Sequence, residues 1–268
     1  MRVTMPPGER LTVALRDHAG GLPALVPYVT AGYPRRDDTV AVLRAAQDAG
    51  CAAVEIGIPF SDPLADGPSV QRAGWQALRN GMTMGLAIEQ VATARAAGVT
   101  LPLALMTYVN PVLSHGLDPF CADAAAAGAD GIIVPDLPAG EASDLRDAGA
   151  AHGLALIPMV APTTPTERIE LACHNAAGFI YCVGVVGTTG ARAEIAAEAF
   201  DLLDRVRAST PLPRAIGFGL SRHEHLVALR GRCEAAVVGS ALLDAMSSHP
   251  DDGAAAASMF LHGMLHAA

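Results

Sequence analysis

Three carboxylates stand close together early in the chain, and their types and spacing suit acid–base chemistry. Glu55 lies inside a short apolar run from Val54 to Ile58, which predicts a buried strand. A buried carboxyl group without a partner is costly as an anion, so its pKa rises and it can hold a proton near neutrality. Asp62 and Asp66 follow in a loop rich in proline and glycine. One acid on a strand and another on the following loop suit proton transfer by two groups.

A purely structural interpretation stands beside this one. Asp62 and Asp66, taken alone, are typical of turn-forming residues in a Pro/Gly loop. Glu55 differs, because propensity disfavours glutamate in a buried strand and no turn explains it. Ser69, just past the loop, is expected to cap a helix that runs to Arg79.

Composition excludes several classes of protein. The 268 residues are 51% hydrophobic with a mean hydropathy of +0.33, enough for a large core. No apolar run reaches the roughly 18 residues that span a bilayer, and the start lacks a signal peptide. The net charge of −9, without a Lys/Arg cluster, argues against nucleic acid or an anionic membrane as partner. Five scattered cysteines predict reduced core thiols in a cytoplasmic protein. His223 and His225 alone are weak evidence for a metal, and none is predicted.

Strand-like runs alternate with helical patterns eight times along the chain. Such alternation predicts parallel pairing, and eight units in about 250 residues predict a closed (β/α)8 TIM barrel, an α/β fold. We expect one domain over 1–268, with an extra N-terminal helix near 8–19. An open doubly wound sheet is the alternative, but no Gly-x-Gly-x-x-Gly follows the first strand. The expected strands are 24–30, the Glu55 run, 103–109, 131–136, 154–160, 178–183, 214–219 and 235–239.

Glycine-rich turns follow the seventh and eighth expected strands, at 217–219 and at Gly239-Ser240. Glycine lets backbone approach an anion closely, and helix N-termini present unpaired N–H groups. Barrels often hold phosphate at this place. The loop 187–190 could supply a further N–H and act as a lid. The alternative is that these glycines only make tight turns. The residues alone indicate a small phosphorylated substrate without naming it.

Several segments in unbroken order resemble the tryptophan synthase α subunit. They are Pro27–Gly32, Glu55–Gly67, Met106–Pro111, Ala161–Thr163, Gly187–Gly190 and Gly217–Gly219, and the likeness runs from about residue 22 to 245. That family is a (β/α)8 barrel that cleaves indole-3-glycerol phosphate to indole and glyceraldehyde 3-phosphate. The resemblance therefore implies a retro-aldol lyase acting late in tryptophan biosynthesis.

The resemblance also implies roles for individual residues. Glu55 would be the general acid/base that protonates the indole ring carbon, and Asp66 would stabilise the positive charge that develops on the indole nitrogen. These roles require different environments, one that keeps the Glu55 carboxyl group neutral and one that keeps Asp66 ionised. The expected substrate-binding residues are Tyr28 and Phe218 beside the indole ring, Tyr181 near Glu55, Thr189 on the lid, and Gly190, Gly219, Gly239 and Ser240 at the phosphate.

A partner follows from the same resemblance. Asp62, Asn110 and Pro111 match contact positions for a β subunit in an αββα assembly, with pyridoxal phosphate on the partner and no cofactor in this chain. Two residues depart from the family pattern: Gly184 replaces a small hydroxylic residue, and Thr188 replaces a valine. Gly184 is expected to loosen the entry to the lid. Two alternatives stay open, a lyase that works without a β subunit and a non-catalytic subunit that binds phosphate and regulates its partner.

Overall fold

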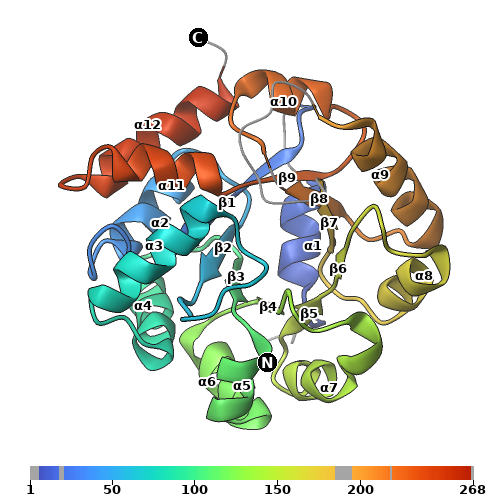
Figure 1. The fold of residues 1–268 in the computed structure, drawn as a ribbon, viewed down its shortest axis with the longest axis horizontal. Helices are drawn as coiled ribbons and strands as arrows, with labels where there is room; N and C mark the ends of the chain where they lie inside the picture. The colour runs from blue at the N-terminus through green and yellow to red at the C-terminus, as the bar shows by residue number, and fades with distance from the viewer. Residues whose placement is uncertain (1–5, 18–20, 185–194, 218, 267–268) are drawn as a thin grey trace.

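Nine parallel strands form a ring in the computed structural model, which describes residues 6–17, 21–184, 195–217 and 219–266. The pairing order is β5-β4-β3-β2-β1-β9-β8-β7-β6, and β5 and β6 lie on either side of Pro158. They therefore occupy one barrel position, and the predicted (β/α)8 architecture is confirmed (Figure 1). The strands are β1 (Ala24–Thr30), β2 (Val54–Gly57), β3 (Leu103–Met106), β4 (Gly131–Ile133), β5 (Ala155–Ile157), β6 (Met159–Val160), β7 (Ile180–Val183), β8 (Arg214–Gly217) and β9 (Ala235–Val238).

Helices other than α1 surround this ring on its outer side (Figure 1). Because helices cover the outside and side chains fill the inside, every residue of β1, β2, β8 and β9 is buried. The helices are α1 (Glu9–Arg16), α2 (Thr39–Asp48), α3 (Pro68–Arg79), α4 (Met84–Ala96), α5 (Val109–His115), α6 (Leu117–Ala127), the 3-10 turn η1 (Ala139–Glu141), α7 (Ser143–Ala151), α8 (Thr166–His174), α9 (Ala197–Ser209), α10 (His223–Ala228), α11 (Ser240–Ser247) and α12 (Gly253–Leu265).

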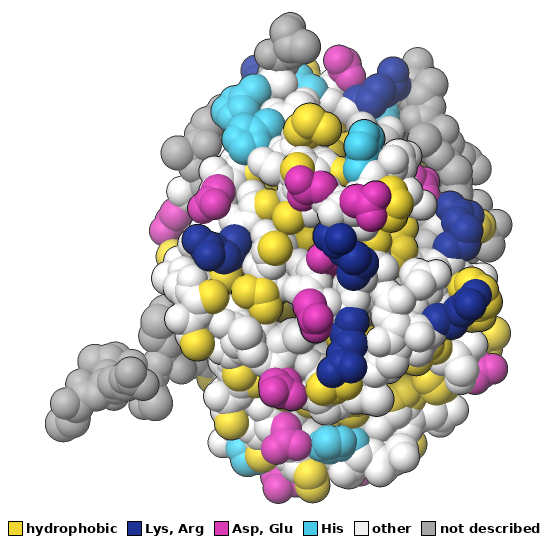
Figure 2. Space-filling view, turned by 90° about the vertical axis from the view of Figure 1, so that its left-hand side faces the viewer, with side chains coloured by type: hydrophobic (Ala, Val, Ile, Leu, Met, Phe, Trp, Pro, Cys, Tyr) yellow, Lys and Arg dark blue, Asp and Glu magenta, His cyan; other side chains and the backbone are white. Residues whose placement is uncertain are grey.

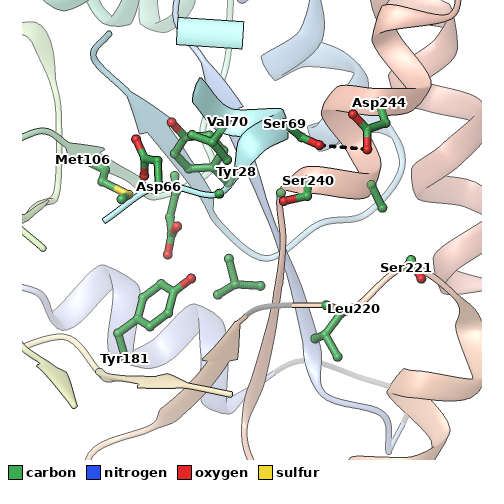
Figure 3. A pocket seen from close by; sticks show the side chains of 16 residues that line it. Tyr28, Asp66, Ser69, Val70, Met106, Tyr181, Leu220, Ser221, Ser240 and Asp244 are labelled. Carbon is green, nitrogen blue, oxygen red and sulfur yellow. Dashed lines mark hydrogen bonds between the residues drawn. The ribbon is translucent and has the colours of Figure 1, made fainter. Parts of the chain in front are cut away.

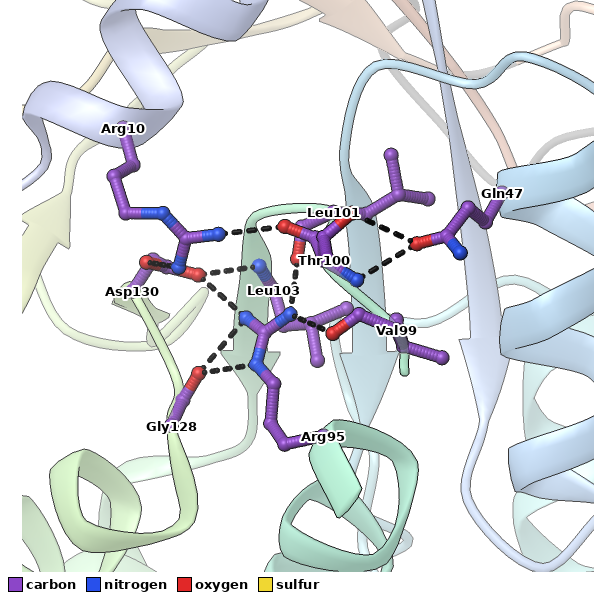
Figure 4. A network of polar contacts seen from close by, with 9 residues as sticks. All are labelled: Arg10, Gln47, Arg95, Val99, Thr100, Leu101, Leu103, Gly128 and Asp130. Atoms are coloured by element: carbon purple, nitrogen blue, oxygen red, sulfur yellow. Dashed lines mark hydrogen bonds and ion pairs between the residues drawn. The ribbon is translucent and has the colours of Figure 1, made fainter. Parts of the chain in front are cut away.

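The predicted N-terminal helix, α1, packs against the amino-terminal ends of the strands. Asp130, which precedes β4, binds Arg10 of α1 at 2.5 Å and Arg95 of α4 at 2.8 Å (Figure 4). Its carboxylate also accepts the Leu103 N–H at 2.9 Å. The Thr12 hydroxyl donates to the Gly178 carbonyl at 2.7 Å. These contacts fix α1 at the end of the barrel opposite the loops that carry the predicted chemistry.

One helix was not predicted. The third strand ends at Met106 rather than at residue 109, and α5 begins at Val109, so Asn110 and Pro111 lie in a helix instead of a loop. Proline is tolerated in a first helical turn because an N–H there has no intrahelical partner. The Val109 N–H donates to Asp136 Oδ1 at 2.9 Å, which supplies an acceptor from the loop after β4.

The expected cap of α3 was also wrong. The helix begins at Pro68, which suits a first helical position, and Gly67 precedes it without a side-chain cap. The Ser69 hydroxyl instead donates to Asp244 Oδ2 of α11 at 2.9 Å. This bond joins two helices that flank the carboxyl ends of β1 and β9. Ser69 therefore links α3 to α11 at this end of the barrel.

Charges are mixed over the surface of the α2, α4 and α12 side. Arginine and acidic side chains alternate there without a patch of one sign (Figure 2). All five cysteines are buried and unpaired, which agrees with the predicted core thiols. No helix within the described residues is long and apolar enough to cross a membrane.

Candidate active site

A pocket of about 330 Å³ opens at the carboxyl ends of the strands. Met106, Asp66, Tyr28 and Tyr181 lie toward one end, and Ser240, Leu220 and Ser221 lie toward the other (Figure 3). The remaining lining residues are Glu55, Gly67, Ser69, Val70, Gly219, Val237, Gly239, Ala241 and Asp244. We call the end with Glu55 and Asp66 the carboxylate-bearing end; the other end is built from the turns after β8 and β9 and is also lined by Asp244 of α11.

Glu55 points into this pocket from β2. The strand register places it beside Tyr28 of β1 and Ala104 of β3. Its side chain is 1% exposed, and its Oε1 atom has no hydrogen-bond partner within the described residues. Burial raises the pKa of Glu55 to about 8. Glu55 therefore carries a proton at neutral pH and has one oxygen free to face a ligand.

Asp66 reaches the same pocket from the loop between β2 and α3. Its backbone N–H donates to the Pro63 carbonyl at 3.1 Å, which folds the loop into a turn. Burial raises the pKa of Asp66 to about 6, and an interaction with the Tyr108 hydroxyl lowers it. Asp66 is therefore ionised at pH 7 while Glu55 is protonated. The two carboxyl groups hold opposite charge states in one cavity, a separation that acid–base catalysis uses.

Two tyrosines form walls of the carboxylate-bearing end, and each rests on a glycine. A Cβ atom added at Gly57 would lie 2.0 Å from the Tyr28 hydroxyl oxygen, and one at Gly217 would lie 2.2 Å from that of Tyr181. Real Cβ contacts do not come so close, so any side chain at either glycine would displace a ring. Burial raises the pKa of both phenols, and both hydroxyls stay neutral.

The opposite end of the pocket offers main-chain donors. Helix α11 begins at Ser240 directly after Gly239, and no side chain caps its first turn. Gly219, with φ +84°, belongs to the turn after β8. The lining contains neither lysine nor arginine within the described residues. An anion here would be held by N–H groups and a helix N-terminus rather than by a full positive charge.

The turn after β8 is held by a histidine that the sequence did not single out for this role. The Ser221 N–H donates to His225 Nδ1 at 3.0 Å, and His225 is buried. His223 lies near α12, with its Nδ1 2.9 Å from the Met264 carbonyl oxygen. No group of three or more His, Cys, Asp or Glu residues in the described parts of the chain could hold a metal ion.

The predicted site residues gather as follows. Seven line the one pocket: Tyr28, Glu55, Asp66, Tyr181, Gly219, Gly239 and Ser240. Thr189, Gly190 and Phe218, together with Thr188, lie outside the described residues. Asp62 and Asn110 are exposed and Pro111 is half-buried, and all three lie outside the pocket lining.

Comparison with known proteins places this barrel in a family. The family model described as the tryptophan synthase alpha chain matches residues 16–264. The chain belongs to this family.

Individual members are similar over nearly the full chain. The tryptophan synthase alpha chain of Chloroflexus aurantiacus is 46% identical over 253 residues, which cover 94% of this chain and 95% of the relative. The tryptophan synthase of Saccharomyces cerevisiae is 44% identical over 85% of this chain, which corresponds to 32% of the yeast protein. A solved structure from the tryptophan synthase α2β2 complex of Pyrococcus furiosus has a TM-score of 0.85 at 37% identity, covering 90% of this chain and 97% of that one.

Gly184, a departure from the family pattern, has a packing reason. Its N–H donates to the Gly217 carbonyl at 2.8 Å, so it extends the pairing of β7 with β8. A Cβ atom at Gly184 would lie 2.7 Å from the same carbonyl oxygen. The Gly184 backbone is therefore paired; residues 185–194, which follow it, lie outside the described residues, so the expected loosening of the lid entry stays a prediction. The absence of a side chain at Gly184 therefore lets the end of β7 pack closely against Gly217 of β8, the glycine on which the Tyr181 ring rests.

Several lining residues could not be assigned from the sequence. Ser69 and Asp244 meet across α3 and α11, and Val70 and Met106 add apolar surface near Asp66. Nothing local distinguishes them from ordinary helix and strand residues.

Proposed function

We propose that this pocket cleaves indole-3-glycerol phosphate into indole and glyceraldehyde 3-phosphate, with Glu55 and Asp66 as its catalytic pair. Glu55 donates its proton to the indole ring carbon that bears the side chain, and Asp66 accepts the indole N–H as positive charge develops there. The ionised Glu55 then takes the proton of the neighbouring hydroxyl group. The carbon–carbon bond breaks, its electrons return to the indole ring, and the hydroxyl carbon becomes the aldehyde.

The observation that carries this proposal is the opposed ionisation of the two carboxyl groups. Protonation of carbon needs a neutral acid, and Glu55 has a pKa of about 8 because it is buried. Stabilisation of the indole cation needs an anion, and Asp66 has a pKa of about 6. The sequence contains no lysine, so cleavage through a lysine imine is impossible in this chain. Acid–base chemistry at the carboxyl groups remains.

The two ends of the pocket suit the two ends of this substrate. Tyr28 and Tyr181 provide aromatic walls for the indole ring, near both carboxyl groups. Gly219, Gly239 and Ser240 provide main-chain donors for the phosphate. By family resemblance, Phe218 would add a second wall, Thr189 a hydrogen bond to Asp66, and Gly190 a phosphate contact.

The proposal includes a β subunit that carries pyridoxal phosphate, in an αββα assembly in the cytoplasm. Asp62, Asn110 and Pro111 are the proposed contacts. Leu64 and Leu113, on the same two segments, are 93% and 57% exposed, and exposed apolar side chains of this kind mark protein interfaces. The Pyrococcus furiosus relative, which belongs to an α2β2 complex, supports this assembly.

The test is incubation of the purified chain with indole-3-glycerol phosphate, with and without a β subunit, and measurement of free indole. If the chain is a lyase, the wild type releases indole, whereas the Glu55→Gln variant releases none but still binds the substrate. Normal turnover by that variant would refute the catalytic assignment. Full activity without any gain from a β subunit would favour the stand-alone lyase. Absence of indole under both conditions would favour the regulatory subunit.

A further inference from the structure

Tyr108 lies behind Asp66 and outside the pocket lining. It is 4% exposed and immediately precedes α5. Its hydroxyl oxygen accepts the Ala65 N–H at 3.0 Å. The same hydroxyl interacts with the Asp66 carboxylate and lowers its pKa, against the larger rise caused by burial. One phenol therefore contacts both the backbone and the side chain of the turn that presents Asp66.

The position of this phenol is set from other parts of the barrel. The Phe60 and Tyr108 rings pack with centroids 5.5 Å apart and planes at 33°. The next residue, Val109, donates its N–H to Asp136 Oδ1 at 2.9 Å. The loop after β2, the start of α5 and the loop after β4 thus meet at Tyr108. A hydroxyl fixed in this way cannot follow Asp66 if the turn moves.

We propose that Tyr108 is a positioning residue that holds Asp66 as an anion directed into the pocket. The inference rests on the proposed function, in which Asp66 must be ionised while a proton is added to the indole ring. A donor to a carboxylate favours its charged form, and the hydroxyl oxygen can at the same time accept the Ala65 N–H. A phenylalanine ring would fill the same space but perform neither task.

The test compares Tyr108→Phe with the wild type, because phenylalanine keeps the ring that packs on Phe60. Two quantities are measured: kcat/KM for indole release between pH 5 and pH 9, and the pKa of the Asp66 carboxyl group by carbon-13 NMR without substrate. Asp66→Asn identifies the NMR signal by its loss. Tyr33→Phe is the matched control, since the buried Tyr33 hydroxyl donates to the Leu243 carbonyl at 3.4 Å.

We expect the pKa of Asp66 and the acidic limb of the pH profile to rise together by about one pH unit in Tyr108→Phe. At pH 6 the ionised fraction would fall from about one half to about one tenth, so kcat/KM falls about fivefold. At pH 8 the change would stay below about twofold, because Asp66 is ionised in both proteins. Tyr33→Phe leaves both quantities unchanged.

Two outcomes separate this inference from the function on which it rests. A loss of the same size at every pH, with an unchanged carboxyl pKa, would overturn it and leave Tyr108 with a packing role only. If the wild type releases no indole but the NMR pKa still rises in Tyr108→Phe, the proposed reaction fails and the positioning of Asp66 stands.

Discussion

Replacing Glu55 with glutamine should abolish indole release and stabilise the fold at alkaline pH. Glu55 is buried, and burial raises its pKa from the ordinary 4.5 to about 8. The native protein therefore holds this proton more tightly than the unfolded chain, and its stability falls as the pH rises from about 4.5 to about 8. The difference of about 3.5 (about 8 minus 4.5), at about 1.4 kcal/mol per pKa unit, corresponds to about 5 kcal/mol. Glutamine has no proton to lose and avoids this cost.

The measurement is urea-induced unfolding of wild type and Glu55→Gln at pH 5 and pH 8.5, followed by circular dichroism. The free energy of unfolding is summed over all steps, since a chain of this size can populate intermediates. At pH 5 the unfolded glutamate is already mostly ionised, which accounts for about 1 kcal/mol of the total. We therefore expect the advantage of the variant to grow by about 4 kcal/mol between the two pH values.

Glu141→Gln serves as the matched control, because Glu141 is exposed on η1. Its effect should stay within about 0.5 kcal/mol at both pH values. If wild type and Glu55→Gln show the same pH dependence, Glu55 does not hold an elevated pKa in the fold. The proton on which the proposed chemistry depends would then have to come from another group.

Three further outcomes follow from the same geometry. The kcat/KM for indole release should rise through pH about 6 as Asp66 ionises and fall through pH about 8 as Glu55 loses its proton. A flat profile from pH 5 to pH 9 would contradict both assignments. Gly217→Ala places a Cβ atom 2.2 Å from the Tyr181 hydroxyl oxygen, so kcat/KM should fall at least about tenfold, at a stability cost of about 1–3 kcal/mol in thermal unfolding. Asp130→Ala leaves two arginines without their carboxylate and should lower the free energy of unfolding in urea by about 3 kcal/mol. KM should stay nearly unchanged, because Asp130 lies at the end of the barrel opposite the pocket. A large rise in KM would contradict this separation.

Most of the fold could be predicted because each buried parallel strand has a local sequence pattern, a short apolar run between turn residues. The exceptions depend on distant contacts. The apolar sequence from Leu103 to Val109 reads as one strand, yet the Val109 N–H pairs with Asp136 and the chain turns into α5. Ser69 resembles an N-cap, yet its acceptor is Asp244 on another helix. Sequence patterns indicate what a residue can do locally, whereas these bonds require knowledge of which elements become neighbours.

The residues of the candidate site likewise fall into those that the sequence could indicate and those that depend on distant contacts. Glu55 could be found because it conflicts with its own strand, and the paired glycine turns could be found because barrels place such turns together. The role of Gly57 could not be found, because it depends on the Tyr28 ring, which reaches Gly57 from the neighbouring strand although the register pairs Tyr28 with Glu55. Tyr108 likewise appears in the sequence as an ordinary residue at a strand end. Its contact with the Asp66 loop exists only in the folded chain.

Within the described residues the pocket lining has no lysine or arginine, and this also bears on Glu55. A lysine or arginine near the phosphate would bind it more strongly, but its charge would lower the pKa of a buried carboxyl group nearby. Main-chain donors at Gly219, Gly239 and Ser240, the proposed phosphate site, bring only partial charges to the described lining. The acid at Glu55 can therefore stay protonated at neutral pH while a doubly charged phosphate lies in the same cavity. Binding the anion through backbone and keeping the carboxyl group neutral are thus two results of one electrostatic arrangement.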